Sequence, residues 1–98
     1  MTQILKNNLE KALFAHKTGH LVEAEKLYRD FLEIASNDSN AWYLLGTLCY
    51  QIKNNVEAKE YLDRSIKLNS NFPEALNSRG VLFKEEGQNR AAERDFRT

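Results

Sequence analysis

The sequence has little of what disulfide-bonded, nucleic-acid-binding or membrane proteins need. It contains one cysteine, Cys49, in 98 residues, which excludes an internal disulfide framework and favours a buried, reduced thiol. Lys plus Arg equal Asp plus Glu at 14 each, so no broad basic field invites nucleic acid or an anionic membrane. No apolar run is long enough to cross a bilayer. We therefore expect neither nucleic acid nor membrane as a partner.

Residues that carry chemistry are also scarce. His16 and His20 have metal-ligand spacing and Glu23 is near, but Gly19 interrupts the helix between them, so we favour ordinary solvent-facing histidines. No nucleophile with a base and no glycine-rich phosphate loop is present. We predict a protein that is not an enzyme, with no catalytic residue, no metal and no cofactor. No charged-then-apolar leader opens the sequence, so we expect a cytoplasmic protein.

What the sequence does contain is a period of 34 residues. A fixed period of this length is typical of helix–turn–helix repeats. Three copies align as residues 5–38, 39–72 and 73–98, within a single domain that spans residues 1–98. Small residues recur at this step or at twice it: Gly46 and Gly80; Ala24, Ala58 and Ala92; Gly19 and Gly87.

Each copy contains two apolar stripes with the spacing of an α-helix. Within the copies, Gly19, Asn54 with Asn55, and Gly87 suit the left-handed conformation that ends a helix. Between the copies, polar segments and Pro73 supply helix stops and N-caps. The pattern predicts helices over residues 3–17, 21–35, 40–53, 55–68, 73–86 and 89–97.

The middle copy carries Trp42-x2-Leu45-Gly46, followed by Ala58-x3-Leu62. This resembles the tetratricopeptide repeat (TPR) family, whose pattern is Trp-x2-Leu-Gly-x2-Tyr followed by Ala-x3-Phe. The resemblance implies an all-α fold: a right-handed superhelix of antiparallel helix pairs, a TPR-like α-solenoid of about six helices. Small residues such as Gly46 and Ala58 then predict close helix contacts inside each repeat.

In this family the first helix of each repeat lines a concave groove that holds a peptide or a partner helix. The resemblance therefore implies a non-catalytic scaffold for protein–protein interaction, with a protein or peptide partner. Carried over by position, the partner-binding residues are Leu9, Leu13, His16, Tyr43, Thr47, Tyr50, Asn77 and Val81.

Two specialised groups within the family do not fit. Members that grip a chaperone's terminal carboxylate use a clamp of Lys, Asn, Asn, Lys and Arg. Members attached to the nucleocytoplasmic sugar transferase carry a ladder of asparagines. The clamp positions hold Leu9, Leu13, Leu44, Glu74 and Ser78, and the ladder positions hold Glu10, Leu44 and Ser78.

Two further hypotheses stay open. The stretch from Lys6 to Tyr28 resembles the start of bacterial repeat arrays that precede a transferase domain. The chain is then the N-terminal repeat segment of a larger bacterial transferase, and positions substrate for a downstream catalytic domain. Separately, the third copy is incomplete, and Phe83 and Phe96 occupy positions that a following helix would bury. We expect self-association through this open end of the third repeat.

Overall fold

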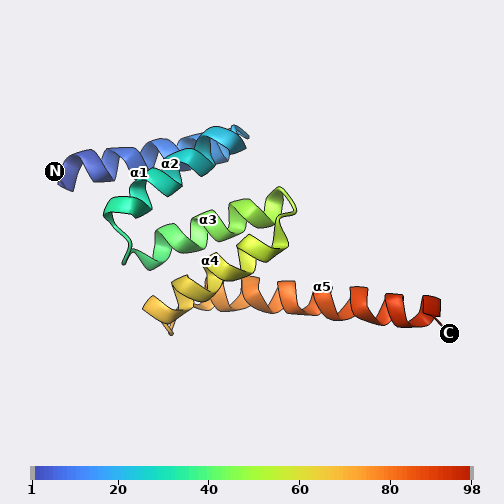
Figure 1. The fold of residues 1–98 in the computed structure, drawn as a ribbon. Coiled ribbons are helices and arrows are strands. Elements are labelled where there is room, and N and C mark those ends of the chain that lie inside the picture. Colours follow the sequence, from blue (N-terminus) through green and yellow to red (C-terminus); the bar gives the residue numbers. More distant parts are fainter. Residues whose placement is uncertain (1, 98) are drawn as a thin grey trace.

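The protein is all-helical. The computed structural model describes the backbone of residues 2–97 and the side chains of residues 6–87, and no strand occurs in that backbone. Figure 1 shows two antiparallel helix pairs that stack in chain order and are followed by one long helix. The all-α class is confirmed, whereas the right-handed sense of the superhelix stays a prediction. The five helices are α1 (Thr2–Lys17), α2 (Leu21–Ile34), α3 (Ser39–Gln51), α4 (Asn55–Leu68) and α5 (Pro73–Arg97).

The turns inside the first two repeats each use one residue with left-handed backbone. Gly19 has a φ of 86°, and Lys53, at the matching position, has a φ of 65°. The expectation that Asn54 or Asn55 takes this conformation is wrong. Asn54 instead caps α4, because its side chain accepts a hydrogen bond from the Glu57 backbone N–H at 3.4 Å. The Asn54 side chain therefore stabilises the N-terminus of α4, while Lys53 takes the left-handed backbone of the turn.

The third turn does not form, so the prediction of about six helices is wrong for this structure. Residues 73–86 and 89–97 belong to one helix, and Gly87 keeps a helical backbone instead of a left-handed one. Gln88 stands where Asn54 caps α4, and glutamine is a poor N-cap. A glycine inside a helix costs only about 1 kcal/mol. The continuous helix therefore keeps backbone hydrogen bonds that a turn would break.

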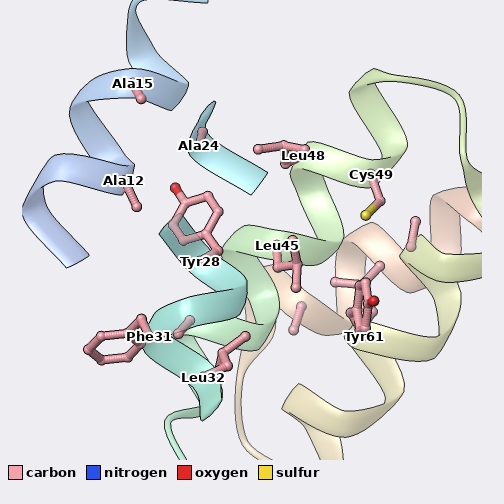
Figure 2. Packing of buried hydrophobic residues seen from close by; sticks show 14 of the residues in the cluster. Ala12, Ala15, Ala24, Tyr28, Phe31, Leu32, Leu45, Leu48, Cys49 and Tyr61 are labelled. Carbon is pink, nitrogen blue, oxygen red and sulfur yellow. The ribbon is translucent and has the colours of Figure 1, made fainter. Parts of the chain in front are cut away.

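The core lies between the paired helices. Tyr28, Leu45, Leu48 and Leu62 are fully buried, and Figure 2 shows Tyr28 and Leu45 among the helices of the first two repeats. A Cβ built on Gly46 would lie 3.0 Å from Leu62 Cγ and 3.3 Å from the Ala58 carbonyl oxygen. The close helix contact predicted from the small residues is confirmed in the second repeat.

The third repeat lacks this contact. A Cβ built on Gly80, at the position that matches Gly46, would meet no heavy atom of the described residues within 4 Å. The side chains of Ala92 and Phe96, which the pattern places opposite it, lie outside the described residues. The α5 helix continues past Gly87, so its first half packs on α4 of the preceding repeat and not on a second helix of the third repeat.

Two side chains join the first repeat to the second. Arg29 on α2 donates hydrogen bonds to the Tyr61 hydroxyl at 2.6 Å and to Glu57 Oε2 at 3.0 Å, both on α4. Trp42 donates its Nε1–H to the Ser36 carbonyl oxygen at 2.7 Å, and its ring lies 5.6 Å from that of Tyr61. Trp42 thus packs at the junction between the two repeats.

Candidate functional site

The first helices of the three repeats, α1, α3 and α5, share one side of the molecule, here called the first-helix face. Two hydrogen bonds link them in sequence. His16 Nε2 on α1 bonds to Gln51 Oε1 on α3, and the Tyr50 hydroxyl on α3 donates to Glu85 Oε1 on α5 at 2.5 Å. Each bond joins residues 35 positions apart, one more than the repeat length. The same bonding geometry therefore recurs from repeat to repeat.

His16 connects this face to the core of the first repeat. His16 Nδ1 forms a hydrogen bond with the Tyr28 hydroxyl at 2.9 Å, while its other ring nitrogen, Nε2, bonds to Gln51. Tyr28 has no exposed surface, and burial raises its pKa to about 12. His16 thus satisfies a buried hydroxyl, and this bond orients its ring.

A small hollow of about 120 Å³ lies between α3 and α5; we call it the α3–α5 hollow. Its floor consists of two fully buried leucines, Leu62 and Leu82. None of the described residues that line it is charged, so it suits an uncharged group better than an ion. The walls are formed by Thr47, Tyr50, Asn77, Ser78 and Val81.

Four of the eight predicted partner-binding residues therefore meet at one place: Thr47, Tyr50, Asn77 and Val81. Thr47 donates its hydroxyl to the Leu44 carbonyl oxygen at 2.8 Å. The Glu85 carboxylate accepts a hydrogen bond from the Tyr50 hydroxyl, and this bond raises the pKa of Tyr50. The Asn77 amide has no hydrogen bond to another described residue. Asn77 and Ser78 are thus the two wall residues whose side-chain polar groups have no hydrogen bond to another described residue and are available to a ligand.

The other four predicted residues lie elsewhere. Leu13 and His16 line a broad, shallow hollow between α1 and α3, together with the charged side chains of Glu10 and Lys17. Leu9 is half-buried against the core, and the ring of Tyr43 lies 5.0 Å from that of Phe72. Tyr43 therefore stabilises the link between the second and third repeats, and this packing role was not predicted.

Sequence reasoning missed the buried leucine floor and the bonds that cross between repeats. The signal for those bonds was present, because Gln51 and Glu85 stand at one register of the 34-residue period. Predicting these bonds also requires knowing that a residue of one first helix faces the position 35 residues later on the next first helix, and not the position 34 residues later. The pattern of a single repeat contains no such information.

The remaining candidate chemistry is dispersed in the described part of the chain. His20 bonds to the Thr18 hydroxyl at 2.9 Å, away from His16, and the described residues hold no group of three side chains suited to a metal ion. Cys49 is fully buried, and burial raises its pKa to about 11, so its thiol stays protonated at neutral pH. Between residues 2 and 97, no helix combines the length and apolar character that a bilayer crossing requires.

Comparison with known proteins agrees with this architecture. The family model for the tetratricopeptide repeat matches residues 39–72, the second of the three copies. UDP-N-acetylglucosamine–peptide N-acetylglucosaminyltransferase of Caenorhabditis elegans is 31% identical to the chain over 88 residues. That alignment covers 90% of this chain but only 8% of the transferase, so the chain spans a small part of its relative. With its 34-residue period and stacked helix pairs, the chain belongs to the tetratricopeptide repeat family.

Proposed function

We propose that this chain is a non-catalytic protein–protein interaction module that binds a peptide or a helix of a partner on its first-helix face. Repeats of this family mediate such interactions in general, and the chain offers a suitable surface. The observation that carries the proposal is the α3–α5 hollow, which combines a leucine floor with the free amide of Asn77. A cytoplasmic scaffold is the setting that this proposal implies.

The hollow has the chemistry of a specificity pocket. Its volume of about 120 Å³ admits one aliphatic side chain of a ligand, and the apolar floor favours such a group over a charged one. Asn77 lies on the wall and can pair with the ligand backbone through both its carbonyl and its amide N–H groups. Affinity then comes from a few residues around one pocket.

The test starts from peptides selected on the immobilised chain from a random peptide library. Binding of a selected peptide is measured by titration calorimetry for Asn77→Ala and Val81→Asp. We expect each variant to weaken binding at least about tenfold, which corresponds to losing roughly 1.4 kcal/mol of binding free energy.

The matched control is Val56→Asp, the same substitution at a valine on α4 that is 81% exposed. It should leave the affinity unchanged. Unchanged binding by both hollow variants, or equal weakening by the control, would refute the proposed site. Tyr43→Ala is unsuitable as a probe, because Tyr43 packs on Phe72 and its loss also affects stability.

The transferase relative favours a second candidate, in which these repeats position substrate for a catalytic domain that follows them. The asparagine ladder associated with such transferases is absent, since its positions hold Glu10, Leu44 and Ser78. Any substrate contact must therefore use other groups, such as Asn77. The parent reading frame tests this candidate: a transferase domain encoded downstream supports it, and a frame without one refutes it.

A further inference from the structure

The hydrogen bond between Tyr50 and Glu85 lies where two hollows of the first-helix face meet. Tyr50 is a wall of the α3–α5 hollow, and it also lines a second hollow of about 360 Å³. The other residues that line this second hollow are Gln51, Lys53, Asn55 and Glu85, and we call it the Glu85 hollow. The Tyr50 hydroxyl donates to Glu85 Oε1 at 2.5 Å and so holds the carboxylate in place. The two hollows are therefore neighbours that share one aromatic wall.

Another part of α5 shows what an aromatic ring next to a glutamate attracts. There, Lys59 Nζ of α4 lies 4.8 Å from the centre of the Phe83 ring and 3.7 Å from Glu86 Oε2. The face of an aromatic ring carries partial negative charge, so the ring and the carboxylate attract the same ammonium group. A ring and a glutamate placed together on this helix thus favour a cation.

A second example of this combination joins α2 to α4. The Arg29 guanidinium lies 5.4 Å from the centre of the Tyr61 ring and donates to Glu57 Oε2 at 3.0 Å. Tyr50 and Glu85 form the same combination of ring and carboxylate. Among the described residues, however, no lysine or arginine forms an ion pair with Glu85 or lies over the Tyr50 ring. A ligand can therefore supply the cation.

We propose that the Glu85 hollow binds a lysine or arginine side chain of the same peptide whose aliphatic side chain fills the α3–α5 hollow. This inference rests on the proposed function and names the chemistry of its ligand. Glu85 stands one helical turn after Val81, which is about 6 Å along α5. Side chains of a bound peptide reach this spacing at about two residues in an extended segment and about four in a helix. The ligand therefore carries an aliphatic and a basic residue at one of these two spacings.

Two lysines of the chain lie close enough to affect this charge preference. Lys84 occupies the register of Tyr50, whose side chain reaches from α3 toward the following repeat, so on α5 this direction leads away from α3. Lys53 lines the Glu85 hollow itself, is exposed, and forms no ion pair with another described residue. Because Tyr50 holds Glu85 in place, the carboxylate sets the preference and Lys53 weakens it. Lys53→Gln should therefore strengthen the binding of a basic peptide.

Titration calorimetry with a peptide selected from a random library on the immobilised chain tests the proposal. The selected peptides should carry a lysine or arginine at one of the two spacings from an aliphatic residue. Glu85→Gln keeps an acceptor for the Tyr50 hydroxyl but removes the charge, and we expect it to weaken binding about threefold to tenfold. The matched control is Glu86→Gln, the same change at the next residue of α5, whose carboxylate pairs with Lys59. This control should leave the affinity unchanged.

A second peptide, with norleucine in place of the basic residue, separates charge pairing from packing. It should bind the parent chain and Glu85→Gln with equal affinity, because the group that Glu85 attracts is already absent. Selected peptides without a basic residue, or an equal effect of Glu85→Gln on both peptides, would overturn this inference. If Asn77→Ala still weakened binding in that case, the proposed function would stand and only the basic subsite would be wrong. If neither the hollow variants nor Glu85→Gln changed the affinity, both would be wrong.

Discussion

Gly46 offers the sharpest test of how the repeats pack. The structure places the Cβ of any larger residue 3.0 Å from Leu62 Cγ and 3.1 Å from Leu62 Cδ2. The Ala58 carbonyl oxygen would lie 3.3 Å away, and as backbone it cannot move without shifting α4. Leucine at this position adds three further carbon atoms beyond the Cβ. Gly46→Leu must therefore push α3 and α4 apart.

The expected cost is that of overpacking a core, roughly 1–3 kcal/mol or more. Leucine also removes the helix penalty of glycine, which returns about 1 kcal/mol. We expect a net loss of about 1–2 kcal/mol from a total stability on the order of 5–15 kcal/mol. In a chain of this size, each kcal/mol lowers the Tm by roughly 4–8 °C.

The assay is urea and thermal unfolding followed by circular dichroism, at concentrations where the chain is monomeric. Gly80→Leu is an internal control, because it makes the same change at the same register where an added Cβ meets open space. It should stabilise the chain by about 1 kcal/mol, the helix penalty of glycine alone. If Gly46→Leu and Gly80→Leu changed the Tm equally, the close contact between α3 and α4 would not exist.

Two further predictions follow from the backbone and from buried hydroxyl and thiol groups. Lys53→Gly should raise the free energy of unfolding by about 1 kcal/mol, because Lys53 has a left-handed backbone with a φ of 65° that glycine adopts without strain. The control Lys67→Gly, in the last turn of α4, should lower the free energy of unfolding instead. A loss of stability for Lys53→Gly in urea unfolding would contradict this prediction. Burial raises the pKa of Tyr28 from 10.0 to about 12 and that of Cys49 from 9.0 to about 11. The protonated forms are favoured in the folded state, so their contribution is complete below pH 9 and is lost as the pH rises through these folded-state pKa values. The free energy of unfolding in urea should decrease between pH 9 and pH 12. In Tyr28→Phe this decrease should be smaller at the alkaline end of the range. An equal decrease in the variant would assign the loss of stability to other groups.

Local pattern predicted much of the helical framework and little of the site. The helix bounds of the first four elements agree with the structure to within two residues at each end, because caps and apolar spacing are local properties. The hollow was only half predicted. Thr47 and Asn77 were expected to share a surface, but Leu62 and Leu82 were not among the predicted partner-binding residues. Whether a buried leucine also lines a surface hollow depends on how the helices of two neighbouring repeats are placed relative to each other.

The sequence by itself determined the repeat, its length and the side of each helix that is buried, because these follow from periodicity and side-chain size. It also determined the close contact at Gly46, since a Cβ at this position would lie only 3.0 Å from Leu62 Cγ and 3.3 Å from the Ala58 carbonyl oxygen. Tertiary structure alone decided that His16 pairs with Gln51 and Tyr50 with Glu85, because the partners come from different repeats. It also decided that α5 runs straight through Gly87. A glycine permits both a turn and a helix, and with glutamine in place of an N-cap residue at position 88 the backbone keeps the hydrogen bonds of the continuous helix.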